Sequence, residues 1–104
     1  RGKAVALIGP HARTTQELAG NYFEEIGVGS CAGPRCILTM EAAVQAASGA
    51  QVTTVLGCAD RACHAGPDIA AAVAAVQSSE AVVLCMGLDG SLEGEGMDRM
   101  DIRL

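Results

Sequence analysis

The sequence has almost no aromatic residues, with one Tyr, one Phe and no Trp among 104 residues, although half of its residues are hydrophobic. Its core must therefore consist of small aliphatic side chains, which let helices pack close to a sheet. Basic residues are also few, 7 against 12 acidic ones, and the net charge is −5. This balance argues against nucleic acid or an anionic membrane as a partner. No apolar run approaches the roughly 20 residues that cross a bilayer.

The chain also lacks an initiator Met, a signal peptide and a closing element after Leu104. At this length it forms one domain at most. We interpret residues 1–104 as part of a single α/β domain cut from a longer protein, so the missing targeting segment says little about location.

Three short apolar runs, at 3–8, 51–56 and 81–86, are typical of β-strands, and the last is expected to be buried. Strands separated by helices run parallel, with right-handed crossovers. The order therefore predicts an α/β fold, a partial doubly wound, mainly parallel sheet flanked by helices. Because three strands leave two unpaired edges, we expect this sheet to continue beyond Leu104.

Helix signals occupy the segments between these runs. The expected N-caps are Thr14, Thr39 and Asp68, with ends near Gly20, Ser48 and Gln77. The second helix has one apolar face of Met40, Ala43, Val44 and Ala47, and the third has Ile69, Val73 and Val76 on one side among alanines. Residues 20–35 are expected to form a long loop.

Four of the five cysteines form two pairs of equal spacing, Cys31 with Cys36 and Cys58 with Cys63, each in a loop with Gly or Pro. This pattern favours two local disulfides, and hence a secreted protein, over free thiols or a metal site. Cys85 lies in an apolar run and is expected to be a buried free thiol.

Residues 87–99 combine four glycines with four carboxylates directly after the last strand. Open α/β sheets bind ligands at the carboxyl ends of their strands. Glu93 and Glu95 are therefore candidates for a general acid/base in a sugar-binding cleft, where flanking glycines let a ligand approach closely. The alternative is that both are solvated loop charges.

Other motifs favour less specific interpretations. Residues 27–32 match the letters of a dinucleotide loop, but no strand precedes them and Pro34 follows. Residues 89–100 resemble the start of a calcium loop, but Met100 replaces the final Glu ligand. His11 and His64 lack a partnered nucleophile, so we expect loop or surface histidines, with a sugar contact by His11 as the alternative. We expect no metal and no cofactor.

Four stretches in this order resemble the C-terminal α/β sandwich domain of glycoside hydrolase family 3, in its β-xylosidase and α-arabinofuranosidase-like branch. They are VALIGPHA (5–12), GNY (20–22), GCADRAC (57–63) and VVLCMGLDGSLEGEGMDR (82–99). The resemblance covers nearly the whole chain, and its last two motifs are the most specific.

The resemblance implies a retaining β-glycosidase, acting on β-xylosides of xylan or arabinoxylan, whose nucleophile is an Asp on an N-terminal (β/α)8 barrel absent from this chain. Glu93 matches the acid/base and Glu95 is the second choice, while Asn21 and Tyr22 match residues near the substrate. The implied partners are a carbohydrate and the barrel of the same parent chain, without which the fragment is inactive. Two alternatives are a non-catalytic α/β module, for carbohydrate binding or interdomain packing, and a cytosolic flavodoxin-like domain with free cysteines.

Overall fold

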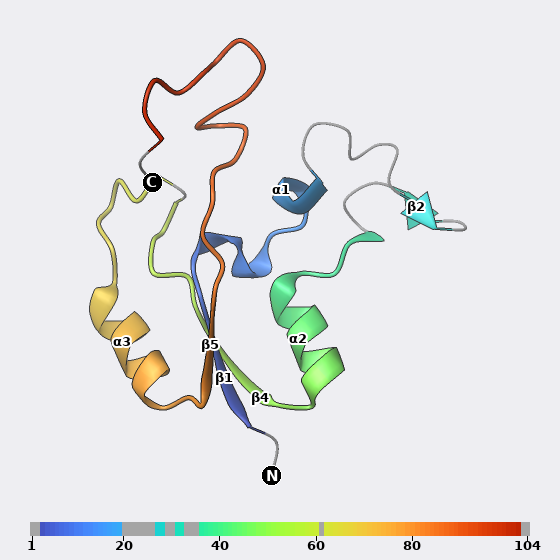
Figure 1. Cartoon of the computed structure of the whole chain (residues 1–104), viewed down its shortest axis with the longest axis vertical. Helices are drawn as coiled ribbons and strands as arrows, with labels where there is room; N and C mark the ends of the chain where they lie inside the picture. Colours follow the sequence, from blue (N-terminus) through green and yellow to red (C-terminus); the bar gives the residue numbers. More distant parts are fainter. Residues whose placement is uncertain (1–2, 20–26, 29–30, 33–35, 61, 103–104) are drawn as a thin grey trace.

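Three parallel strands form the centre of the fold, with β1 (Ala4–Ile8) between β4 (Gln51–Val55) and β5 (Ala81–Leu84) (Figure 1). The computed structural model describes residues 3–19, 27–28, 31–32, 36–60 and 62–102. Val5 is in register with Val52 on one side and with Ala81 on the other. The predicted parallel α/β fold is therefore confirmed.

Helices α2 (Met40–Ser48) and α3 (Ile69–Gln77) cover opposite faces of this sheet (Figure 1). Both begin at their predicted caps, where Thr39 Oγ1 accepts from Ala42 N at 3.1 Å and Asp68 Oδ1 accepts from Ala71 N at 3.0 Å. Each cap satisfies one of the backbone N–H groups that a helix start leaves without an intrahelical partner. In the part of the chain that is described, no helix has the length and apolar character needed to traverse a bilayer.

The core has one layer on each face, because alternate residues of β1 point to opposite sides. Leu7, which is fully buried, packs with Met40 and Val44 of α2. Ala6 and Ile8 pack instead with Ala75 of α3. The predicted apolar face of the second helix is thus confirmed for Met40 and Val44.

Helix α3 approaches the sheet through small residues, Ala72 and Ala75. Its larger side chains, which the sequence places together on one side, are 39–60% exposed: Ile69, Val73 and Val76. Alanines at the contact allow a close approach to the strands, and the larger residues are left outside it.

Strand β5 corrects one expectation, because it is largely exposed instead of buried. Val82, Leu84 and Met86 are 41%, 68% and 55% exposed. The physical reason is the strand order: β5 lies at an edge, and α3 contacts β4 and β1. The side chains of this segment that pack into the core on the α2 side are Val83, in β5, and Cys85, which follows it.

The segment after β1 also differs from expectation. A 3-10 helix, η1 (Pro10–Arg13), follows Gly9, and α1 (Gln16–Ala19) begins one residue later than a Thr14 cap would place it. The Thr14 hydroxyl instead donates to His11 O. Within the predicted loop at 20–35, β2 (Gly27–Val28) and β3 (Cys31–Ala32) pair antiparallel.

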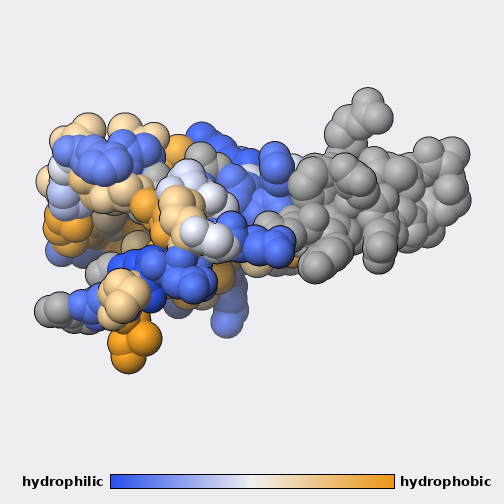
Figure 2. Space-filling view, turned by 90° about the horizontal axis from the view of Figure 1, so that it is seen from above, coloured by the Kyte–Doolittle hydropathy of each residue, from blue (hydrophilic) through white to orange (hydrophobic). Residues whose placement is uncertain are grey.

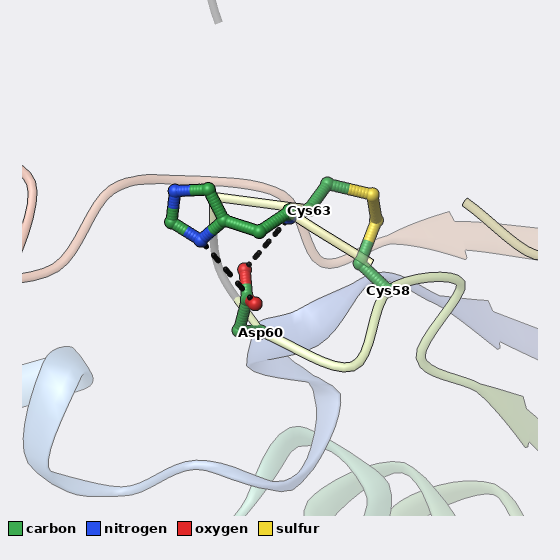
Figure 3. The surroundings of a disulfide bond; sticks show 4 residues. Cys58, Asp60 and Cys63 are labelled. Carbon is green, nitrogen blue, oxygen red and sulfur yellow. Dashed lines mark hydrogen bonds and ion pairs between the residues drawn. A yellow bond between two sulfur atoms is a disulfide. The ribbon is translucent and has the colours of Figure 1, made fainter. Parts of the chain in front are cut away.

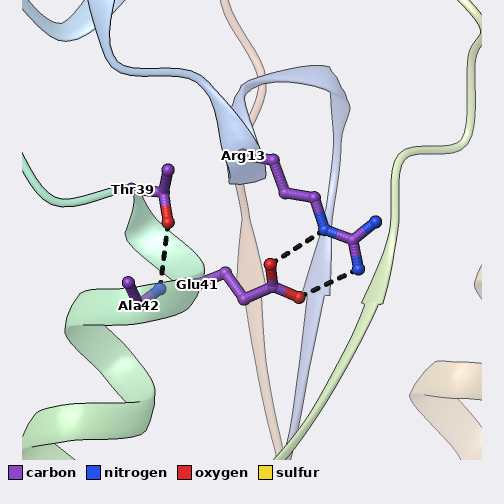
Figure 4. Close-up of polar contacts among 4 residues, drawn as sticks. All are labelled: Arg13, Thr39, Glu41 and Ala42. Atoms are coloured by element: carbon purple, nitrogen blue, oxygen red, sulfur yellow. Dashed lines mark hydrogen bonds and ion pairs between the residues drawn. The ribbon is translucent and has the colours of Figure 1, made fainter. Parts of the chain in front are cut away.

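A bidentate ion pair joins η1 to α2. Arg13 Nε and Nη2 donate to the two carboxylate oxygens of Glu41 at 2.8 and 2.9 Å (Figure 4). The guanidinium lowers the pKa of the Glu41 carboxyl. This pair fixes the turn after β1 relative to the helix that covers one face of the sheet.

Candidate active site

Three loops leave the carboxyl ends of the three strands and lie at one end of the molecule. They are the turn at 9–13 after β1, the disulfide loop at 57–66 after β4, and the carboxylate loop at 87–99 after β5 (Figure 1). Seen from this end, the surface mixes hydrophilic and hydrophobic residues (Figure 2). This is the edge at which open α/β sheets bind ligands, as the sequence predicted.

The root of the carboxylate loop is held by backbone hydrogen bonds. Cys85 N donates to Ile8 O at 2.6 Å, and His11 N donates to Cys85 O at 3.1 Å. Gly9 lies beside Cys85 with a φ of 131°, and a Cβ on Gly9 would come within 2.4 Å of the Cys85 carbonyl oxygen. The turn after β1 therefore fixes where the loop begins.

His11 is buried, at 7% exposure, and this corrects the expectation of a loop or surface histidine. Its ring lies against the loop root, since a Cβ on Gly87 would be 3.3 Å from His11 Cδ2 and 3.4 Å from Nε2. Nε2 has no hydrogen-bond partner among the described residues, and Nδ1 lies 3.5 Å from Thr14 Oγ1. The sequence alone could not show this burial, which depends on the neighbouring strand.

Asp89 organises the first half of the carboxylate loop. Its backbone carbonyl accepts from the N–H groups of Leu92 and Glu93, both at 3.0 Å, and its Oδ1 accepts from Ser91 N at 2.9 Å. The side chain thus replaces a backbone acceptor in a local turn. Glu93 is anchored at its backbone by this turn.

A second turn organises the tip. Gly94 and Met97 exchange two backbone hydrogen bonds, N to O, of 3.2 and 2.9 Å. Glu95 and Gly96 are the central residues, and only Gly96 has a positive φ, 78°. A positive φ at the third turn position is typical of type II turns and explains the glycine there.

Both candidate carboxylates are exposed, with Glu93 after the first turn and Glu95 at the second. Their carboxylate oxygens have no hydrogen-bond or ion-pair partner in the described part of the chain. Asn21 and Tyr22, the other predicted site residues, lie outside the described residues. The structure therefore brings Glu93 and Glu95 to the expected edge and does not test their placement relative to Asn21 and Tyr22.

A pocket of about 530 Å³ lies between the three loops. Its lining is mostly apolar, with one cationic residue from the end of the carboxylate loop. The lining residues are Pro10, Cys58, Ala62, Cys63, Met86, Gly87, Leu88, Leu92 and Arg99. Leu92 directly precedes Glu93, so the loop that bears the candidate carboxylates forms part of the pocket wall.

This pocket was not predicted from the sequence. The sequence feature that could have indicated it is that each lining segment directly follows a strand. Using that signal required the strand order, in which β4 and β5 flank β1.

The predicted disulfide between Cys58 and Cys63 is confirmed, with Cα atoms 5.0 Å apart (Figure 3). Asp60 closes the same loop by accepting from His64 N at 3.2 Å, and this hydrogen bond lowers the pKa of the Asp60 carboxyl. Cys63 has a φ of 57°, uncommon for a residue with a side chain. The cross-link and Asp60 together hold the pocket wall opposite the carboxylate loop.

The remaining cysteines agree with expectation where they are described. Cys85 is a buried free thiol, and burial raises its pKa, which keeps it neutral and unreactive. Cys36 is disulfide-bonded, while the side chain of Cys31, its expected partner, lies outside the described residues. His64 lies on the surface, as predicted, paired with Asp60.

No cluster of three or more His, Cys, Asp or Glu residues within the described ranges could hold a metal ion. In the segment that resembles a calcium loop, Asp89 Oδ1 is already bonded to Ser91. The Asp89 oxygen is used for the turn, which is a structural role.

Comparison with known proteins gives one matching family, the glycosyl hydrolase family 3 C-terminal domain, over residues 1–104. The chain is 37% identical to beta-D-xylosidase 1 and 38% identical to beta-D-xylosidase 3 of Arabidopsis thaliana, over 100% and 98% of its length. It is 34% identical, over 96%, to a probable exo-1,4-beta-xylosidase of Aspergillus terreus. The chain spans only 11–12% of the length of these relatives. A comparison with solved structures finds no significant match.

Proposed function

Because this chain belongs to the glycosyl hydrolase family 3 C-terminal domain family, we propose that it supplies the general acid/base loop of a retaining β-glycosidase. The proposed substrates are terminal β-linked sugars, specifically β-xylosides of xylan or arabinoxylan, since the relatives compared above are named as xylosidases. The proposed nucleophile is an Asp on a (β/α)8 barrel elsewhere in the parent chain. By this proposal the 104 residues alone are inactive.

The chemistry explains what such a loop has to provide. A retaining glycosidase uses two carboxyl groups about 5–5.5 Å apart, one as nucleophile and one first as acid and then as base. The second must reach a sugar held mainly by another domain. A carboxylate on a loop that projects from the carboxyl edge of a sheet meets this requirement.

The observation that carries the proposal is the placement of Glu93 and Glu95. Both are exposed on the loop that follows β5, and neither carboxylate is engaged by a side chain or backbone group of the described residues. Structural carboxylates in this chain behave differently: Glu41 is bound to Arg13 and Asp60 to His64. Glu93 and Glu95 are therefore available to a ligand.

Glu93 is our first choice for the acid/base. Its backbone N–H donates to Asp89 O, so its backbone is bonded into the turn nearest the loop root. Glu95 is a central residue of the turn between Gly94 and Met97, further from that anchor. A proton donor must be held in one geometry, which favours Glu93, and Glu95 would contact a sugar hydroxyl.

The test uses the full-length parent with Glu93→Ala and Glu95→Ala, assayed on xylobiose and on dinitrophenyl xyloside. Xylobiose has a poor leaving group that needs protonation, and dinitrophenolate does not. Loss of the acid/base should lower kcat/KM for xylobiose by about 10²- to 10⁴-fold and leave that for the aryl substrate nearly unchanged. The aryl kcat should fall, because its second step needs the base, and added azide should restore it as the glycosyl azide.

Glu80→Ala is the matched control, since Glu80 is an exposed carboxylate at the opposite end of β5. It should change neither substrate's kinetics. If only Glu95→Ala shows the pattern, the acid/base is Glu95. If neither variant does, the loop is not catalytic.

The second candidate function is a non-catalytic carbohydrate-binding or interdomain packing module. The apolar pocket that the carboxylate loop helps to line is the observation that favours it. Calorimetric titration of the parent with xylo-oligosaccharides would support this function if binding were retained and hydrolysis absent. The upstream reading frame discriminates as well, since a barrel-sized segment with an Asp nucleophile supports the enzyme.

A secreted location is part of the proposal. It rests on the Cys58–Cys63 disulfide, because such bonds persist mainly in oxidising compartments.

A further inference from the structure

We infer that His11 is a positioning residue for the carboxylate loop, an inference that rests on the proposed function. Its ring packs between the turn after β1 and Gly87, where the carboxylate loop begins after β5. The residue does not touch the proposed reacting atoms. It determines where the backbone that carries Glu93 begins.

The first support is the contact between His11 and Gly87. Apart from the chain neighbours of Gly87, the described atoms within 4 Å of the place where a Cβ on Gly87 would lie are two ring atoms of His11, at 3.3 and 3.4 Å. Gly87 is the first residue of the carboxylate loop. Because the ring fills the space beside it, the loop root cannot shift towards β1.

The second support is that His11 is buried and its backbone is anchored. Its side chain is 7% exposed, and its backbone N–H donates to Cys85 O two residues before Gly87. Its neighbour Ala12 is fully buried, and Arg13 is paired with Glu41 on α2. The backbone at His11 is therefore anchored to the segment that follows β5, and its neighbour Arg13 to helix α2.

The third support concerns the ring nitrogens. Nε2 is buried without a hydrogen-bond partner in the described residues, and the Nδ1 contact to Thr14 is long, at 3.5 Å. A buried polar atom without a partner destabilises a protein. The ring therefore acts by its shape, and a planar apolar ring should replace it.

The experiment compares His11→Ala, His11→Phe and Gly87→Ala in the full-length parent, again on xylobiose and dinitrophenyl xyloside. A misplaced acid lowers kcat/KM only for xylobiose, whose leaving group needs protonation. General damage to the fold lowers kcat/KM for both substrates. Displacement of a catalytic group by about 1 Å can lower a rate about 100-fold. We expect His11→Ala to lower kcat/KM for xylobiose by about 10- to 100-fold and that for the aryl substrate by less than about threefold.

His11→Phe is the conservative replacement and should keep xylobiose hydrolysis within about threefold of the parent. Gly87→Ala tests the same contact from the other side and should lower xylobiose hydrolysis selectively, by a smaller factor. Gly87→Ala also tests the inference if His11→Ala does not fold. Gly49→Ala is its control: Gly49 follows α2, outside the three loops, with no described atom within 4 Å of an added Cβ, so the ratio between the two substrates should not change.

Equal loss on both substrates in His11→Ala and Gly87→Ala would overturn the inference, as would unchanged xylobiose hydrolysis. Equal damage from His11→Phe and His11→Ala would also overturn it, because a ring nitrogen would then be required. Its failure is separable from that of the proposed function. If Glu93→Ala or Glu95→Ala shows the acid/base pattern and the His11 variants do not, only the positioning role is wrong.

Discussion

Replacement of Gly9 by Ala should be among the most damaging single changes in this chain. Gly9 has a φ of 131°, and an added Cβ would lie 2.4 Å from the oxygen and 2.6 Å from the carbon of the Cys85 carbonyl. Both are backbone atoms of Cys85, the residue that follows edge strand β5, so they cannot rotate away. Relief of the clash requires the end of β1 to separate from the residues that follow β5.

The magnitude follows from two contributions. An unfavourable φ costs about 1–2 kcal/mol. Separation weakens two backbone hydrogen bonds, Cys85 N to Ile8 O and His11 N to Cys85 O, each worth about 1 kcal/mol. Together they give roughly 3–4 kcal/mol, which corresponds to at least about 100-fold faster exchange through local opening. Native-state hydrogen exchange of the full-length parent, followed on peptides covering β1 and β5, measures this.

Gly66→Ala is the matched control, because Gly66 has a φ of 84° but no atom within 4 Å of an added Cβ. It should show only the conformational cost, about tenfold faster exchange confined to the disulfide loop. The reasoning is refuted if both variants accelerate exchange equally, or if exchange in β5 is unchanged by Gly9→Ala.

Two further predictions concern the ion pair and the disulfide. Arg13 lowers the pKa of the Glu41 carboxyl, so the pair stabilises the fold above the ordinary pKa of 4.5 and this contribution is lost as the pH falls through the lowered pKa. Arg13→Gln should therefore lower the thermal midpoint slightly at pH 7 and leave no difference in strong acid; a difference that grew in acid would contradict this. Tryptic digestion without reductant should leave residues 62–99, which contain Cys63, covalently linked to residues 36–61, which contain Cys58. Residues 36–61 also contain the disulfide-bonded Cys36, so a further peptide should stay attached through it. Separate alkylated peptides would show that the bond is absent.

Local signals in the sequence predicted the helices and strands well. Thr39 and Asp68 cap their helices as expected, and α2 ends at Gly49, whose φ of 59° suits a residue without a side chain. Each of these features depends on interactions within a few residues. The carboxylate loop could be predicted for the same reason, since its glycines and acidic residues lie close together in the sequence.

Features that depend on strand order could not be predicted. The composition of 81–86 indicated a buried strand, but burial of β5 depends on which strands α3 covers. The same holds for His11, whose burial comes from the passage of Cys85 and Gly87 beside it. The sequence contains no local signal for either, because the contacts join residues about 75 positions apart, across helices α1, α2 and α3.

The contrast between the root and the tip of the carboxylate loop bears on how the proposed enzyme works. At the root, the backbone of Cys85 is hydrogen-bonded to both Ile8 and His11, and Gly9 packs against it so closely that a Cβ would clash. At the tip, the hydrogen bonds that hold Glu93 and Glu95 within the described residues are those of short-range turns, and both residues are exposed. Because catalytic groups must be held within about 0.5 Å of the productive geometry, the turns alone are insufficient. The rigid root sets the direction of the loop, and contacts with the substrate and the proposed barrel must fix its tip.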